Sequence, residues 1–183
     1  MVIWLIGLSA SGKTTIGREL WHRWKAESPE TVFLDGDEVR DVFAQFKHPD
    51  PYGIEGRRAN AERMTELCAL LDRQGINVVC SILSIFDEMR AANRERFSRY
   101  FEVFLDVPLE VVRQRDPKGI YAAAARGEMK DVVGLDIPFP TPRDYDLRID
   151  NSSDEVSPAL LAAKILAEAQ ADEPRPAQAL ELV

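Results

Sequence analysis

The residues best suited to chemistry lie close together near the amino end of the chain. Gly7 to Thr14 reads Gly-Leu-Ser-Ala-Ser-Gly-Lys-Thr and fits the phosphate-loop pattern G-x-x-x-x-G-K-[ST] at every position. Such a loop turns main-chain N–H groups towards phosphate oxygens, and the start of the following helix adds positive potential. Lys13, a predicted catalytic residue, is expected to reach the β- and γ-phosphates, and the Thr14 hydroxyl to ligate Mg²⁺. The predicted ATP-binding residues of the loop are Gly7, Ser9, Ala10, Ser11, Gly12, Lys13, Thr14 and Thr15.

Two carboxylates form a second candidate group. Asp35 and Asp37 flank Gly36 directly after the apolar run Thr31–Leu34. Carboxylates at this place could hold Mg²⁺ through water or accept the proton of an attacking hydroxyl. Asp37 could instead cap the amino end of a helix over 38–46, and both roles can hold at once. We favour a catalytic and metal-binding role for Asp37, together with Thr14, because a phosphate-loop kinase needs such a group beside the phosphates.

A phosphate loop is shared by GTPases, ATPases and kinases, so other features must separate these classes. The chain has no Asn-Lys-x-Asp guanine-reading tetrapeptide, and we interpret the late Asp-x-x-Gly match at 131–134 as coincidence. Residues 116–142 mix Gly, Pro and several bases, which is typical of a mobile flap that closes over phosphates. The sequence therefore favours a kinase. A non-catalytic nucleotide-binding protein is a weaker alternative, because it has no need to keep Lys13, Thr14 and Asp37 together.

The elements that must position these groups alternate between apolar runs and amphipathic segments. This alternation predicts an α/β fold, a three-layer sandwich with a parallel, roughly five-stranded sheet, as in P-loop NTPases. Ligands in such folds bind beyond the carboxyl ends of the strands, where both motifs lie. The predicted strands are Val2–Ile6, Thr31–Leu34, Ile76–Leu83, Tyr100–Leu105 and Asp144–Ile149. The predicted helices cover 13–25, 38–46, 64–71, 86–99, 108–115 and 158–170, with a short alanine-rich helix in the flap and a loop over 47–56.

Length and composition limit the remaining possibilities. The 183 residues suit one kinase domain over 1–170, followed by a tail over 171–183 that we expect to be disordered. The net charge of −8, from 23 basic and 31 acidic residues, argues against a nucleic-acid partner. The apolar stretch Val2–Leu8 is too short to span a bilayer and lacks the features of a signal peptide, so we expect no membrane partner. Cys68 and Cys80 sit in apolar patterns and indicate reduced core residues of a cytoplasmic protein.

Beyond the phosphate loop, the chain resembles the adenylylsulfate kinases (APS kinases). Asp35–Arg40 is similar to the family's D-G-D-N-x-R, and Arg115–Tyr121 reads Arg-Asp-Pro-Lys-Gly-Ile-Tyr, a specific family run. Phe101–Glu110 and Gly134–Phe139 also match, in the family's order, so that the resemblance covers about residues 1–150. It implies transfer of the γ-phosphate of ATP to the ribose 3′-hydroxyl of adenylyl sulfate, with ATP and Mg²⁺ required. It also implies a homodimer.

The same resemblance implies roles for further residues. Ser84 ends a segment similar to S-F-I-S, whose last serine is a phosphorylated intermediate in the family, and it is a third predicted catalytic residue. Direct in-line transfer, which needs only positioning and charge neutralisation, is the alternative to that covalent step. Arg115 and Lys118 are implied to bind ATP. The implied acceptor-binding residues are Asp35, Arg40, Tyr52, Arg57, Asn60, Leu83 and Lys118.

Three departures from the family pattern fall on the acceptor side. Gly56 replaces the aspartate before Arg57, Asp87 replaces a cation, and Val132 replaces a phenylalanine that closes the second side of the acceptor adenine. Half of an aromatic sandwich is worth roughly 1–3 kcal/mol per base. Adenylyl sulfate is the leading acceptor. The alternative is another nucleotide-linked anion, such as a cytidine diphosphate conjugate in surface-polysaccharide synthesis, because a pyrimidine needs less stacking area.

Overall fold

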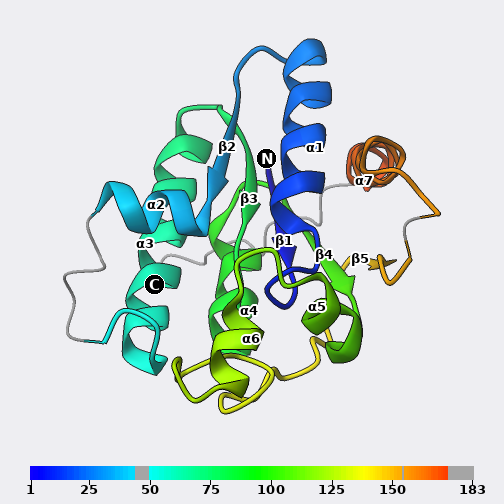
Figure 1. Ribbon diagram of the computed structural model, residues 1–183. Helices are drawn as coiled ribbons and strands as arrows, with labels where there is room; N and C mark the ends of the chain where they lie inside the picture. Colours follow the sequence, from blue (N-terminus) through cyan, green and yellow to red (C-terminus); the bar gives the residue numbers. More distant parts are fainter. Residues whose placement is uncertain (44–49, 154, 173–183) are drawn as a thin grey trace.

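A five-stranded parallel sheet forms the centre of the molecule (Figure 1). The computed structural model describes residues 1–43, 50–153 and 155–172. The strands are β1 (Val2–Ile6), β2 (Thr31–Asp35), β3 (Asn77–Ser81), β4 (Tyr100–Asp106) and β5 (Leu147–Asp150), in the order β2-β3-β1-β4-β5. The predicted parallel sheet is confirmed. Two bounds were wrong by more than one residue, because β3 stops two residues before Leu83 and β5 begins three residues after Asp144.

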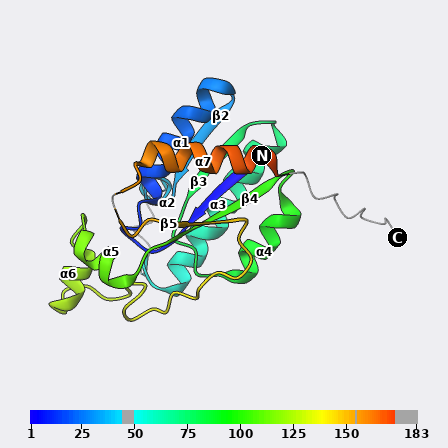
Figure 2. The ribbon, with the colours of Figure 1, turned by 90° about the vertical axis from the view of Figure 1, so that its right-hand side faces the viewer.

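Helices cover both faces of this sheet. They are α1 (Lys13–Glu27), α2 (Gly36–Val42), α3 (Ile54–Arg73), α4 (Asp87–Arg96), α5 (Leu109–Arg115), α6 (Ile120–Ala125) and α7 (Pro158–Ala171). α1 and α7 pack together on one face, and α3 and α4 lie on the other (Figures 1 and 2). Figure 2 shows α5 and α6 beyond the end of the sheet. The predicted three-layer sandwich, with a short alanine-rich helix in the flap, is confirmed.

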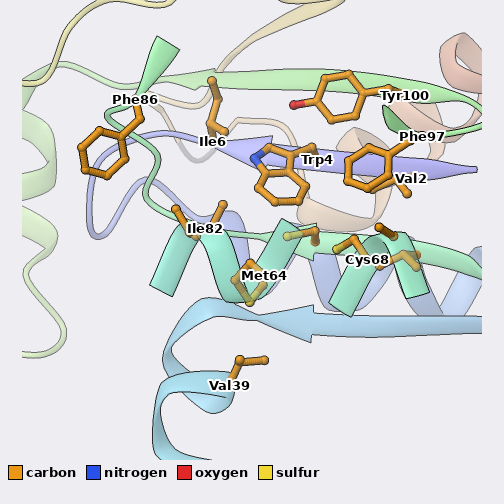
Figure 3. Close-up of a cluster of buried hydrophobic side chains, with 14 of the residues drawn as sticks. Val2, Trp4, Ile6, Val39, Met64, Cys68, Ile82, Phe86, Phe97 and Tyr100 are labelled. Atoms are coloured by element: carbon orange, nitrogen blue, oxygen red, sulfur yellow. The ribbon is translucent and has the colours of Figure 1, made fainter. Parts of the chain in front are cut away.

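The side chains of β1 show how the sheet separates two buried layers. Successive strand residues point to opposite faces, so Ile3 and Leu5 join one cluster with α1 and α7. Trp4 and its even-numbered neighbours join the other cluster, with Met64 of α3 (Figure 3). The Trp4 ring lies 6.3 Å from the ring of Phe97 and 6.2 Å from that of Tyr100, measured between centroids. Because β1 is buried on both faces and paired on both edges, the loop that follows it starts from a rigid strand.

The first turn of α1 is held close to the sheet. Ser81 Oγ at the end of β3 donates to the Lys13 carbonyl oxygen at 3.1 Å. A Cβ atom at Gly17 would come within 2.5 Å of the same Ser81 Oγ and within 2.8 Å of the Phe33 ring. Only glycine therefore allows α1 to pack at this depth. The close packing fixes the position of the helix start that follows the phosphate loop.

Two helix starts differ from the prediction. α2 begins at Gly36, and its cap is Asp35, whose Oδ1 accepts from the Asp37 N–H at 2.9 Å. The alternative role of Asp37 as the helix cap was therefore wrong, because Asp35 occupies that position one step earlier. α3 begins at Ile54, so the predicted loop over 47–56 ends too late. The predicted end of the preceding helix at Phe46 lies outside the described residues, as do residues 173–183 of the tail predicted over 171–183. The first residue of that predicted tail, Ala171, is the last residue of α7.

Two further expectations concern the whole chain. Cys68 and Cys80 are both buried and free, as expected of reduced core cysteines. In the part of the chain that the structure describes, none of the helices has the length and apolar character needed to cross a membrane.

Candidate active site

The phosphate loop follows β1 and curls before α1, as its sequence predicts. Gly12 has φ +96°, and Ala10 has φ +63°, so both residues adopt left-handed backbone conformations. Lys13 Nζ lies over the loop and donates to the carbonyl oxygens of Gly7 at 3.0 Å and Leu8 at 2.6 Å. These two carbonyl oxygens hold the ammonium group against the phosphate loop.

The surroundings of Lys13 alter its ionisation. Burial removes water from the ammonium group and lowers the pKa of Lys13 from 10.5 to about 8, although the carboxylates of Asp37 and Asp35 oppose this shift. A desolvated cation interacts more strongly with an incoming anion than one in water does. The site is thus prepared to receive phosphate charge.

Asp35 connects the phosphate loop to α2. Thr14 Oγ1 donates to Asp35 Oδ2 at 2.6 Å, while the other carboxylate oxygen caps α2. Asp35 is almost completely buried at the end of β2. The direct hydrogen-bond partner of the Thr14 hydroxyl is therefore Asp35. The predicted metal-binding role of Thr14 and Asp37 stays a prediction.

Asp37 lies two residues further along, in the first turn of α2, and faces two cations. Arg40 Nη1 donates to Asp37 Oδ1 at 2.9 Å, and Lys118 of the flap donates to Asp37 Oδ2. Burial acts to raise the pKa of Asp37, but the hydrogen bond and charge of Lys118, with Arg40 and Lys13, outweigh burial and lower it. The pKa of Lys118 is raised, because the hydrogen bond and charge of Asp37 outweigh its own desolvation. Asp37 is therefore an ionised hydrogen-bond acceptor beside the phosphate loop.

The predicted acceptor-binding residues meet on the other side of Asp37. The Arg40 guanidinium lies 5.0 Å from the centre of the Tyr52 ring. Asn60 of α3, only 2% exposed, donates from Nδ2 to the Gly36 carbonyl oxygen at 3.3 Å. Three buried polar atoms here have no hydrogen-bond partner among the described residues, namely Arg40 Nε, Arg57 Nε and Asn60 Oδ1. Unpaired buried polar atoms are rare in folded proteins, and these three lie among the predicted acceptor-binding residues.

The flap contacts the predicted acceptor-binding residues through Arg57. Arg57 donates from Nη2 to the Asp131 carbonyl oxygen of the flap at 2.8 Å. Val132 is only 3% exposed and belongs to a buried cluster with Leu8, Val112 and Tyr121. A phenylalanine at position 132 would therefore have to displace these neighbours or leave the cluster.

Two other predicted site residues lie after the end of β3. Leu83 and Ser84 follow β3, and Ser84 is only 3% exposed. Asp87, the expected anion in place of a cation, accepts from Arg90 Nη2 at 2.8 Å, so its charge is already paired. Asp87 also lines an open pocket of about 490 Å³ with residues 140–143. None of the predicted site residues lines that pocket.

Sequence analysis did not predict a role for Asn151, which contacts both the phosphate loop and Arg115. Asn151, directly after β5, donates from Nδ2 to the Ser11 carbonyl oxygen at 2.9 Å. Its own main-chain oxygen accepts from Arg115 Nη1 at 2.7 Å. The flap residue Tyr121 adds a bond from its hydroxyl to the Ser9 carbonyl oxygen at 3.3 Å. The only signal for Asn151 was its place after the last predicted strand, at the carboxyl edge of the sheet.

Comparison with known proteins agrees with this arrangement. The family model described as adenylylsulphate kinase matches residues 1–150. An adenylyl-sulfate kinase of Clostridium kluyveri is 38% identical over 157 residues, covering 85% of this chain and 77% of that protein. A cytidine diphosphoramidate kinase of Campylobacter jejuni is 36% identical over 151 residues, covering 82% of this chain and 86% of that protein.

A solved structure extends the similarity to three dimensions. The APS kinase of Mycobacterium tuberculosis, in complex with AMPPNP and APS, superposes with a TM-score of 0.81 at 30% identity and covers 92% of this chain and 96% of that one. The family match covers most of the chain, and the predicted kinase fold and phosphotransferase class are confirmed. The chain belongs to the adenylylsulfate kinase family of P-loop kinases, phosphotransferases that act on a hydroxyl group.

Proposed function

We propose that the protein is an ATP- and Mg²⁺-dependent kinase that phosphorylates a hydroxyl group of a small nucleotide-linked anion. Adenylyl sulfate is the leading candidate for this acceptor. The observation that carries this proposal is the position of Asp37. Its carboxylate is bound by Arg40 from the acceptor side and by Lys118 from the flap, and it influences the ionisation of Lys13 in the phosphate loop. One carboxylate thus lies between the two predicted substrate positions.

The residues of the phosphate loop suit a magnesium ion that is shared with ATP. The Thr14 hydroxyl and the Asp35 carboxylate supply hard oxygen atoms 2.6 Å apart. No group of three or more His, Cys, Asp or Glu side chains that could hold a metal occurs within residues 1–43, 50–153 and 155–172. Thr14 would hold the ion directly and Asp35 through water, with phosphate oxygens completing the coordination. The bound ion would neutralise charge on the transferred phosphoryl group.

The protein side chains then position and neutralise the reactants. Lys13 leaves the carbonyl oxygens of the loop and binds the β- and γ-phosphates. Lys118 moves from Asp37 towards the same phosphates, which frees the Asp37 carboxylate to accept the hydrogen bond of the acceptor hydroxyl. Arg40, Arg57 and Asn60 offer their unpartnered atoms to the acceptor. Direct in-line transfer fits these positions, and the predicted phosphorylation of the buried Ser84 is not required.

A coupled assay of ADP release tests this function. Wild-type protein with ATP, Mg²⁺ and adenylyl sulfate should release ADP and form a product phosphorylated at the 3′-oxygen, identified by ³¹P NMR. Lys13→Ala should show no release above background. Equal background rates for both proteins, with adenylyl sulfate and with a panel of cytidine and uridine nucleotides, would overturn the proposal.

One observation favours a second candidate acceptor, a cytidine diphosphate conjugate. Val132, in the family's phenylalanine position, is buried in the flap cluster and offers no aromatic ring to a purine. The 36% identity to a cytidine diphosphoramidate kinase supports this alternative. In the same assay, a kcat/KM for the cytidine conjugate above that for adenylyl sulfate would make it the acceptor. The expected homodimer and cytoplasmic location remain predictions.

A further inference from the structure

A short segment of the flap, residues 131–137, is organised around one carboxylate. Asp136 Oδ2 accepts from the Asp131 N–H, and Asp136 Oδ1 accepts from the Val132 N–H, both at 2.6 Å. Asp131 has φ +61°, a left-handed conformation that is uncommon for a residue other than glycine. The two bonds hold the peptide groups on both sides of Asp131.

Planarity of the peptide group links this carboxylate to Arg57. The Val132 N–H and the Asp131 carbonyl belong to one trans peptide plane and point in opposite directions. Asp136 holds the N–H end, and the carbonyl end accepts from Arg57 Nη2 at 2.8 Å. Rotation of this peptide plane would break both bonds together. The carboxylate therefore sets the direction of the carbonyl that holds the guanidinium group.

The contact with the Asp131 carbonyl also determines which nitrogen atoms of the Arg57 guanidinium remain to bind a ligand. The flap carbonyl occupies Nη2, while the buried Arg57 Nε has no partner in the described part of the chain. Burial lowers the pKa of Arg57, the charge of Arg40 lowers it further, and Tyr52 acts in the opposite direction. A guanidinium held at one nitrogen can present its remaining N–H groups in a fixed direction.

We propose that Asp136 is a positioning residue for the acceptor, acting through the Asp131–Val132 peptide on Arg57. This inference rests on the proposed function, because it takes Arg57 as an acceptor-binding residue. The Asp136 side chain is exposed, and it accepts from two main-chain N–H groups of the flap itself. Its effect is confined to how Arg57 is oriented before the acceptor binds.

The turn has other bonds that should keep it folded without this carboxylate. Gly134 N–H donates to the Ile137 carbonyl oxygen at 2.8 Å, and Ile137 N–H donates to that of Val132 at 3.2 Å. Val133 and Ile137 are both buried. A substitution at Asp136 should therefore free the peptide plane while the flap stays packed.

Steady-state kinetics of three variants provide the first test, with adenylyl sulfate and the cytidine conjugate each used as acceptor. Asp136→Ala should raise the acceptor KM by roughly tenfold, because a misdirected Arg57 binds less well, with kcat and the ATP KM little changed. Asp136→Asn keeps one carbonyl oxygen as acceptor and should give an intermediate KM. Glu128→Ala, which removes an exposed carboxylate of the same flap paired with Arg126, is the matched control and should behave as wild type.

A double-mutant cycle separates positioning from general support of the flap. If Asp136 acts through Arg57, adding Asp136→Ala to Arg57→Ala should raise the acceptor KM no further. Additive effects, or an Asp136→Ala variant with unchanged acceptor KM, would overturn the inference. A parallel rise in the ATP KM with a lower Tm would also overturn it, because the carboxylate would then support the flap as a whole.

A measurement without turnover keeps this inference apart from the proposed function. In ¹⁵N NMR spectra, the Arg57 Nε–H signal should shift and exchange faster in Asp136→Ala than in Glu128→Ala. An unchanged signal contradicts the link between Asp136 and Arg57 even if the enzyme is an active kinase. If wild type phosphorylates no nucleotide acceptor, the proposed function and the acceptor-positioning role both fail, and a shifted Arg57 signal then supports only the link between Asp136 and Arg57.

Discussion

The position and the pKa of Lys13 are both set by its surroundings in the phosphate loop. The carbonyl oxygens of Gly7 and Leu8 hold its ammonium group, and burial lowers its pKa to about 8. The cation is thus kept partly out of water until a phosphate arrives. Such an arrangement contributes to binding and transition-state stabilisation, and it contributes little to the stability of the empty protein.

We therefore expect Lys13→Ala to lower kcat by about 10³-fold or more, because one preorganised charge is lost from the transition state. The Tm should stay the same or rise, since the substitution removes a desolvated charge. Lys25→Ala, on the same helix with its ammonium group over the Trp21 ring, is the matched control and should keep full activity. A Lys13→Ala protein with a clearly lower Tm would show that the lysine is needed for folding.

Asp37 allows a similarly sharp test, because it is not the cap of α2. Asp37→Asn keeps the shape of the side chain and removes the negative charge that faces Arg40 and Lys118. We expect kcat to fall by about 10²-fold or more. The Tm should fall only modestly, because the exposed pair with Lys118 adds little stability, whereas the buried Arg40 loses the charge of its partner. Rates and melting curves of the purified variant check both parts. Retained activity with lost stability is the result that contradicts a catalytic role.

At the scale of elements, the end of β5 supports the phosphate loop that follows β1. Asn151 reaches the Ser11 carbonyl oxygen through its side chain and accepts from Arg115 through its main chain. A Cβ atom at Gly12 would lie only 2.5 Å from Asn151 Nδ2. The loop conformation and the position of Asn151 therefore depend on each other.

Asn151→Asp should raise the ATP KM by about tenfold, because it replaces the N–H donor with an oxygen that repels the Ser11 carbonyl. The acceptor KM should not change. Ser153→Ala, two residues further along and exposed, serves as control. Equal increases in both KM values would mean that the substitution disturbs more than the phosphate loop.

The sequence predicted the elements well, because each strand is a short apolar run followed by polar residues. It placed the start of α2 wrongly, since Asp35 and Asp37 are both good caps and only the three-dimensional position of Thr14 decides between them. It placed the start of α3 too late, because the first turns of this helix carry few apolar residues. Asn151 was missed because a contact between residues 140 positions apart leaves no local pattern.

At the scale of the whole molecule, a buried polar network links the sheet to α4. Glu102 of β4 is 0% exposed, accepts from the Tyr100 hydroxyl at 2.7 Å and lies 3.2 Å from Arg90 Nε. Desolvation raises the pKa of Glu102 from 4.5, although Tyr100, Arg90 and Arg94 oppose it. The folded protein therefore holds this proton to a higher pH than the unfolded chain does.

The sign of the pH dependence follows from that difference. As pH rises from 4.5 through the raised pKa, the unfolded chain releases the proton first, so the stabilising contribution of Glu102 decreases. Glu102→Gln cannot titrate, and its free energy of unfolding should improve relative to wild type as pH increases from 5 to 8. Urea unfolding across that range measures the difference. Glu128→Gln, at an exposed carboxylate whose pKa is lowered by Arg126, should show no such trend, and a trend of opposite sign at Glu102 would contradict the prediction.

The central position of β1 in the sheet also determines when the phosphate loop can fold during synthesis of the chain. Translation produces the phosphate-loop sequence before the strands that pair with β1, which begin only at Asn77 and Tyr100, and Asn151 comes later still. While the chain is still growing on the ribosome, the loop has neither a paired strand beneath it nor the amide that braces it. Before these segments have been made, the nascent chain therefore has no folded nucleotide site that ATP could stabilise. A product that ends before Asn151 lacks the hydrogen bond from Asn151 to the phosphate loop.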